Sequence, residues 1–169
     1  MPEAQPARRY RWVWFFVVLG VLTTGGVAAN VWFNLRQQLT SQQLADAHRL
    51  WKQKKPGIYD LHYTVKREVN PDLAGTVPQN YTAHINGKEV LVTSAGGHPL
   101  KTGDYDFDTM DSLFDAIDRQ LYSDADPGRP RAFVKATFDG SDGHVKHYVH
   151  SIMRTRERLE VTVEMTIPD

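Results

Sequence analysis

The longest run of hydrophobic positions lies near the start of the sequence and contains no charged residue. It extends from Trp12 to Leu35, and arginines bound it on both sides. A helix of this length, at about 1.5 Å per residue, spans the roughly 30 Å hydrocarbon core of a bilayer. Tryptophan stands near both ends of the run, as is typical of membrane interfaces. The pattern predicts a transmembrane helix over residues 12–35.

A cleavable signal peptide is the alternative interpretation of the same run. Small residues up to Ala29 would suit a cleavage site, but the apolar run continues through 31–33. More arginines precede the run than follow it, so the positive-inside rule places the N-terminus in the cytoplasm. We therefore expect a cytoplasmic tail over 1–11, a connector over 36–43 and an extracytoplasmic domain over 44–169. Cleavage near Ala29 would instead give a secreted protein.

Alternation of apolar and polar residues predicts β-strands in the rest of the chain. Every second residue from Tyr59 to Val65 is apolar, and the residues between them are polar. Asn86 and Gly87 separate two further runs, and this pair supplies the positive φ angles of a tight hairpin. Residues 70–79 form a predicted loop. The predicted strands are 59–69, 81–85, 89–93, 132–138, 145–153 and 159–167.

Apolar residues at helical spacing predict two helices. The first covers about 44–55 and follows a capping box made by Thr40 and Gln43. The second covers about 108–122, with Asp108 as its N-cap. The resulting order is helix, three strands, helix, three strands. It predicts an α+β domain in which both helices pack on one face of an antiparallel sheet of about six strands.

Several of these segments together resemble an uncharacterised bacterial family, the domain of unknown function 6174. The resemblance covers about residues 44–152. Its structural implication is a small exported or membrane-anchored α+β domain, and it implies no reaction. His144 and Val145 depart from the aromatic residue and the proline that are usual in the family's last turn. The segments that carry the resemblance are Leu50-Trp51 followed by Tyr59 and Tyr63, the hairpin 81–90, the helix 109–117, and Phe138-Asp139 with Gly143.

Composition and charge exclude several classes of protein. The 169 residues contain 20 basic and 20 acidic side chains, so the formal net charge is zero. This balance argues against a nucleic-acid-binding protein that depends on bulk positive charge. Cysteine is absent, which excludes disulfides, thiolate metal sites and cysteine nucleophiles.

Alternating carboxylates suggest one candidate ion site. Asp104, Asp106 and Asp108 are spaced like the opening of a calcium-binding loop. Thr109, however, stands where such a loop requires glycine. The alternative is a helix N-terminus, where carboxylates interact favourably with the helix dipole. We expect this alternative.

A group of histidines suggests a second candidate. On a regular strand, His144 and His150 share a face while His147 points away, so the three cannot converge on one ion. No acidic ligand is evident nearby. We therefore expect solvent-facing strand histidines, with His144 and His150 as the remaining metal candidates.

No catalytic motif is present in the sequence. Ser94 and Ser141 lie in glycine-rich segments, but neither is part of a Gly-x-Ser-x-Gly elbow. We expect a non-catalytic binding domain that uses no cofactor. Its partners would be membrane lipid through residues 12–35 and a protein or small ligand, but not nucleic acid. The alternative is a secreted or membrane-anchored enzyme whose active site shows no motif.

Overall fold

The computed structural model describes the backbone of residues 8–36, 38–68 and 79–168, and the side chains of the same residues except 8–11 and 27–36. Most of the predicted loop 70–79 and the side chains around Ala29 lie outside these residues. The chain divides into two compact units, Met1–Gln38 and Leu39–Asp169, and each is described by itself.

The described residues of the first unit form one helix, α1 (Arg8–Arg36), followed by Gln38. The described side chains of this helix, residues 12–26, are all exposed. Its two threonines bond to their own helix: the Thr23 hydroxyl donates to the Leu19 carbonyl (2.9 Å), and the Thr24 hydroxyl donates to the Gly20 carbonyl (2.8 Å). Within the part of the chain that the structure describes, no helix combines the length and the apolarity of a membrane span.

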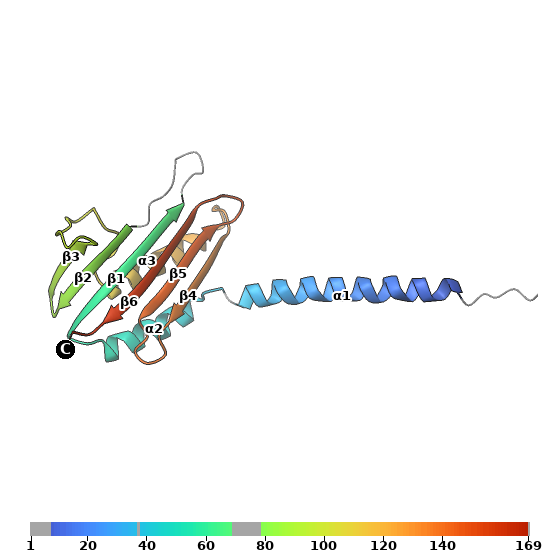
Figure 1. The fold of residues 1–169 in the computed structure, drawn as a ribbon, viewed down its shortest axis with the longest axis horizontal. Helices are drawn as coiled ribbons and strands as arrows, with labels where there is room; N and C mark the ends of the chain where they lie inside the picture. The colour runs from blue at the N-terminus through green and yellow to red at the C-terminus, as the bar shows by residue number, and fades with distance from the viewer. Residues whose placement is uncertain (1–7, 37, 69–78, 169) are drawn as a thin grey trace, which may run out of the picture. The chain divides into compact units, whose positions relative to one another are not determined.

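The second unit confirms the predicted α+β class and the predicted order of its elements. Its six strands form one sheet in the order β3-β2-β1-β6-β5-β4, and every neighbouring pair is antiparallel. Figure 1 shows α2 and α3 on one face of this sheet, behind the strands. The elements are α2 (Ser41–Lys54), β1 (Ile58–Glu68), β2 (Gln79–Asn86), β3 (Glu89–Ser94), α3 (Met110–Asp124), β4 (Ala132–Phe138), β5 (Val145–Ile152) and β6 (Arg158–Thr166).

Helix α2 begins as its sequence predicts. The Thr40 hydroxyl accepts a hydrogen bond from the Gln43 N–H (3.2 Å), and the Gln43 side chain accepts one from the Thr40 N–H (3.0 Å). This capping box is therefore confirmed. Residues 38–40 are not helical, so they separate α2 from α1. The helix starts at Ser41, inside the range 36–43 that the sequence assigns to a connector.

Helix α3 begins two residues later than predicted, and its N-cap is Thr109 instead of Asp108. Thr109 has an extended backbone, and its hydroxyl accepts from the Ser112 N–H (3.1 Å). The Ser112 hydroxyl accepts in turn from the Thr109 N–H (3.1 Å). Two reciprocal bonds favour Thr109, because a single side chain at Asp108 could satisfy fewer of the free N–H groups at the helix end.

The β2–β3 hairpin is confirmed, but its turn lies one residue later than predicted. Asn86 still pairs with Glu89, so the central residues of the turn are Gly87 and Lys88. Gly87 has φ +61°, and Asn86 does not have a positive φ. A glycine at the first central position is the requirement of a type II′ turn, whereas an Asn-Gly centre is typical of type I′.

The core lies between the helices and one face of the sheet. Every second residue of β1 from Tyr59 to Val65 is buried there, as the alternation predicts. Trp51 of α2 is completely buried, and its indole ring meets the Tyr59 ring edge-on, with 5.4 Å between centroids. On α3 the buried residues are Met110, Leu113, Phe114 and Ile117.

Two stacked tyrosines in this core differ in how their hydroxyls are satisfied. The Tyr81 hydroxyl accepts a hydrogen bond from the Phe107 N–H (3.0 Å). The Tyr63 hydroxyl is buried and has no hydrogen-bond partner among the described residues. Burial raises the pKa of Tyr63 well above its usual value, so the hydroxyl stays protonated.

We expect opposite results when each of these hydroxyls is removed. Tyr81→Phe leaves the buried Phe107 N–H without an acceptor, which costs about 1–3 kcal/mol of unfolding free energy. Tyr63→Phe removes an unpaired polar atom and leaves the unfolding free energy unchanged or higher. Denaturant unfolding of both variants measures the difference. A loss for Tyr63→Phe as large as that for Tyr81→Phe would contradict the expectation.

Both edge strands of the sheet carry additional backbone bonds. At the β4 edge, the Leu39 N–H donates to the Val134 carbonyl (2.8 Å). At the β3 edge, the Leu100 N–H donates to the Val92 carbonyl (2.8 Å), and the Ser94 N–H donates to the His98 carbonyl (2.8 Å). The residue Leu39, which lies just before α2, therefore occupies part of the β4 edge, and the segment that follows β3 occupies part of the β3 edge.

Candidate functional site

The turn between β4 and β5 is held closed by two backbone hydrogen bonds. The Asp139 N–H donates to the His144 carbonyl (2.8 Å), and the Gly143 N–H donates to the Asp139 carbonyl (3.0 Å). The strand register also shifts beside this turn, because Phe138 pairs with Val145 whereas Thr137 pairs with His147. The turn is therefore a compact loop joined to a bulged strand pair.

The same turn is in close contact with α2. Gly143 has φ +83°, and a Cβ atom at this position would lie 2.4 Å from the Ala47 carbonyl oxygen and 3.0 Å from the Trp51 nitrogen. Lys54 Nζ donates to the Ser141 carbonyl (2.7 Å). Glycine is required at residue 143, because any side chain would meet the helix backbone.

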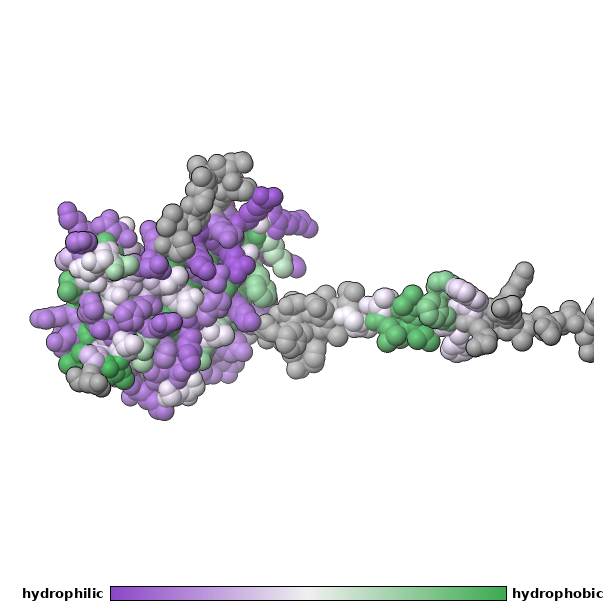
Figure 2. Space-filling view, viewed as in Figure 1, coloured by the Kyte–Doolittle hydropathy of each residue, from purple (hydrophilic) through white to green (hydrophobic). Residues whose placement is uncertain are grey.

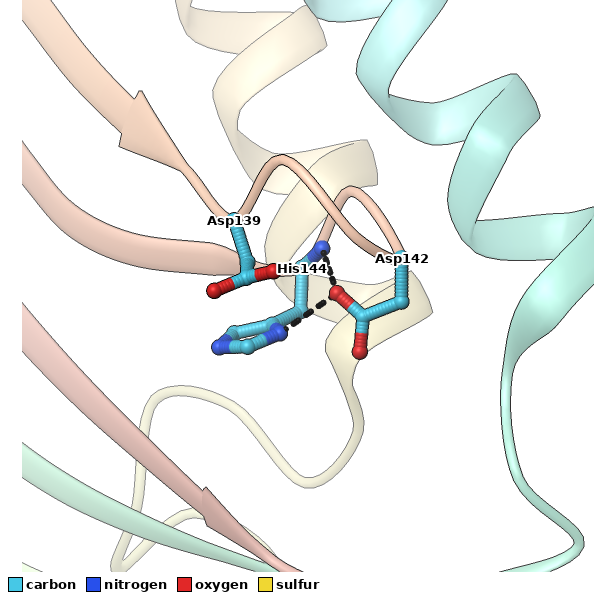
Figure 3. A group of neighbouring side chains, drawn as sticks. All are labelled: Asp139, Asp142 and His144. Carbon is cyan, nitrogen blue, oxygen red and sulfur yellow. Dashed lines mark hydrogen bonds and ion pairs between the residues drawn. The ribbon is translucent and has the colours of Figure 1, made fainter.

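Three side chains of the turn lie together (Figure 3). One ligand atom from each of Asp139, Asp142 and His144 lies within 4.8 Å of the others. Nδ1 of His144 donates to Asp142 Oδ1 (2.7 Å), and the backbone N–H of His144 donates to the same oxygen (3.0 Å). His144 is only 8% exposed, and the two carboxylates are partly buried. No other group of three or more His, Asp or Glu side chains within the described ranges is close enough to share an ion.

Asp139 is the most strongly stabilised carboxylate of the turn. It accepts hydrogen bonds from the Ser141 hydroxyl (2.5 Å) and from the Ser141 N–H (2.8 Å). Its other oxygen accepts from Lys146 Nζ (3.0 Å). The two bonds from Ser141, together with Lys146, hold the pKa of Asp139 well below its usual range. Asp139 is therefore ionised at every physiological pH and can act as an oxygen ligand.

The three aspartates that are spaced like a calcium loop do not converge. Asp104 accepts from the Lys101 N–H (3.2 Å), Asp106 pairs with Arg67 (2.8 Å), and Asp108 accepts from the neighbouring Thr109 hydroxyl (3.3 Å). Each carboxylate therefore has a different partner. Helix α3 begins directly after this segment, in agreement with the alternative of a helix N-terminus.

The expectation of solvent-facing histidines is wrong for His144 and His150, which are both buried. His150 Nε2 lies 2.9 Å from Asp124 Oδ2 at the end of α3. His147 Nε2 lies 3.1 Å from Glu160 Oε1 on β6. Each of the three histidines thus has its own carboxylate partner, and they do not share a site.

The expectation that no acidic ligand lies near these histidines is also wrong. Asp139 and Asp142 precede His144 by five and two residues. The signal that could have found them is the pair of glycines at 140 and 143, which allows so short a segment to fold back. The sequence argument assumed a regular strand, in which side chains alternate between the two faces. Residues of a loop do not alternate in this way, so the argument did not apply to them.

The outer face of the sheet is a second surface with polar side chains in hydrogen-bond contact. Figure 2 shows that this face is mainly hydrophilic. His84 Nδ1 donates to Asp60 Oδ1 (3.0 Å), and Thr93 Oγ1 lies 3.4 Å from His84 Nε2. His62 Nδ1 lies 2.9 Å from Thr82 Oγ1. The helices leave this face uncovered, so these groups are accessible.

Comparison with known proteins gives no relative for this chain. No family model, no curated protein and no solved structure matches it.

Proposed function

We propose that this is a single-pass membrane protein whose second unit is an extracytoplasmic, non-catalytic binding domain. The observation that carries the proposal is the surface of α1. Ten large apolar side chains between Trp12 and Leu22 are each 45–67% exposed. Consecutive helical residues point about 100° apart, so this apolar surface surrounds the helix. Insertion into lipid removes this apolar surface from water, which lowers the free energy by about 25 cal/mol per Å² of surface buried.

Further features of α1 support the same proposal. No charged residue occurs between Arg11 and Arg36, and the helix is continuous across this range. The hydroxyls of Thr23 and Thr24 donate to backbone carbonyls of the preceding turn. A polar group in the hydrocarbon core must form its hydrogen bonds within the protein, and both threonine hydroxyls do so.

The outer face of the sheet is the surface that we propose for the partner, either a protein or a small ligand. Its hydrogen-bonded side chains come from β1, β2 and β3, which pair side by side in the sheet. The resemblance to the domain of unknown function 6174 is part of this proposal, since it implies the same exported or anchored placement.

Membrane fractionation tests the anchor. We expect the full chain, expressed in a bacterium, to stay in membranes washed with alkaline carbonate. Val18→Arg combined with Leu22→Arg should release it, because each arginine at a helix centre costs about 2.5–3.5 kcal/mol on insertion. Ile58→Arg with Leu91→Arg is the matched control, since it adds the same charge at exposed apolar positions of the sheet. Wild-type protein that washes off without detergent would contradict the proposal.

Orientation can be tested separately because the chain has no cysteine. Lys88→Cys introduces one thiol in the exposed β2–β3 turn. We expect an impermeant maleimide to label it in intact spheroplasts. Gln5→Cys in the N-terminal tail is the control and should react only after lysis. The reverse labelling pattern would place the binding domain in the cytoplasm.

One observation favours the alternative of an anchored enzyme. Asp60, His84 and Thr93 have the connectivity of a hydrolytic triad, with the carboxylate at Nδ1 and the hydroxyl near Nε2. If they act together, a fluorophosphonate probe will form an adduct on Thr93 that His84→Asn abolishes. Thr82→Ala is the control, because Thr82 contacts His62 and lies outside this triad. Absence of an adduct would leave the binding domain as the better supported function.

A further inference from the structure

We propose that Asp139, Asp142 and His144 bind a divalent transition-metal ion of the Zn²⁺ class at the β4–β5 turn. The three side chains come from six consecutive residues, so the site is local to one loop. This proposal is independent of the membrane anchor and of the sheet face.

The donor set selects the class of ion. One imidazole nitrogen and two carboxylate oxygens suit Zn²⁺, which binds His and Asp at about 2.0–2.2 Å. Calcium requires six to eight oxygen ligands and does not favour imidazole, and magnesium likewise prefers oxygen. Three protein ligands leave at least one position for water, so the ion would be exchangeable.

The separations within the turn fit a shared ion. His144 Nδ1 and Asp142 Oδ1 are 2.7 Å apart. One ligand atom from each of the three residues lies within 4.8 Å of the other two. Two ligands about 2.1 Å from one metal ion are themselves roughly 3 Å apart. A metal ion bound at Nδ1 would therefore replace the proton between His144 and Asp142. The carboxylate of Asp139 would move toward the ion.

The scaffold around the ligands is already ordered. Backbone bonds close the loop at Asp139 and Gly143, and Gly143 sits against the backbone of α2. The burial of His144 restricts its imidazole ring to one environment. A pre-ordered loop loses little conformational entropy on binding, which favours affinity.

Lys146 provides a specific test of this site, because its ammonium group pairs with one of the proposed ligands. Its Nζ lies 3.0 Å from Asp139 Oδ2, where it neutralises one of the proposed ligands. The side chain is 55% exposed, so it can move into solvent when an ion arrives. The lysine and the metal ion therefore compete for Asp139, and removal of the lysine charge should strengthen metal binding.

The experiment is a calorimetric titration of the full chain in detergent micelles with Zn²⁺ alone. We expect one ion per chain, at least tenfold weaker binding in Asp142→Asn and His144→Asn, and severalfold tighter binding in Lys146→Gln. His147→Asn is the matched control, because His147 lies three residues further along and pairs with Glu160. Its affinity should equal that of the wild type.

Several results would overturn the proposal. These are no saturable binding by the wild type, unchanged binding in His144→Asn, an equal loss in His147→Asn, or weaker binding in Lys146→Gln. Circular dichroism verifies that each variant is folded. If the ligand variants fail to fold, the wild type alone decides the question: paramagnetic Co²⁺ should broaden the imidazole signals of His144 before those of His147 and His150. Simultaneous broadening would contradict a site at this turn.

Discussion

Gly143→Ala is expected to lower the free energy of unfolding by about 3 kcal/mol or more. Two effects add at this position. The residue has φ +83°, which strains any L side chain, and its Cβ would lie 2.4 Å from the Ala47 carbonyl oxygen. The neighbouring atoms belong to the backbone of α2, so they cannot move aside as a flexible side chain could. Denaturant unfolding of the full chain measures the loss.

Gly87→Ala separates the cost of backbone strain from the cost of the contact with α2. Gly87 also has a positive φ, +61°, but no atom lies within 4 Å of an added Cβ. This variant should therefore cost only about 1 kcal/mol, from backbone strain alone. Equal losses in the two variants would show that contact with α2 contributes nothing at residue 143.

Trp51→Ala is expected to cost about 3–5 kcal/mol, because it removes a large and fully buried side chain between α2 and the sheet. The indole N–H has no hydrogen-bond partner among the described residues, so the loss comes from packing alone. Trp51→Phe is the matched control. It keeps an aromatic ring against Tyr59 and removes the unpaired N–H, so it should cost clearly less.

Fluorescence provides a measurement that is specific to this position. Of the four tryptophans in the sequence, only Trp51 follows residue 36. In a variant in which Trp12, Trp14 and Trp32 are replaced by phenylalanine, its emission reports unfolding of the second unit alone. Trp51→Ala itself is followed by near-ultraviolet circular dichroism of the tyrosines. A midpoint equal to that of the wild type would contradict the role of Trp51 in the core.

Local patterns in the sequence were sufficient to predict most of the fold. The alternation along β1 correctly identified its buried face, and the Thr40–Gln43 pair correctly located the start of α2. These features depend on neighbours within a few residues. The N-cap of α3 was misplaced because Asp108 and Thr109 both have capping side chains, and only the reciprocal bond from Ser112 distinguishes them.

The candidate site was harder to predict because it depends on the geometry of a turn, and the other histidine pairs were harder to predict because their partners are distant in sequence. The parity argument for the histidines assumed a regular strand, whereas the strand pairing shifts between Thr137 and Phe138. The carboxylate partner of His150 is Asp124, which lies 26 residues earlier on α3. A sequence does not reveal such a pair until the strand order and the helix placement are known.

The backbone bonds at the two edge strands have a consequence for self-association. A strand from another molecule adds to a sheet by pairing with a continuous row of free N–H and C=O groups. In this protein the carbonyls of Val92 and Val134 and the N–H of Ser94 already form hydrogen bonds within the chain, to Leu100, Leu39 and His98 respectively. Edge-to-edge polymerisation would first have to break these hydrogen bonds. The folded domain is therefore protected against fibril growth through its edge strands.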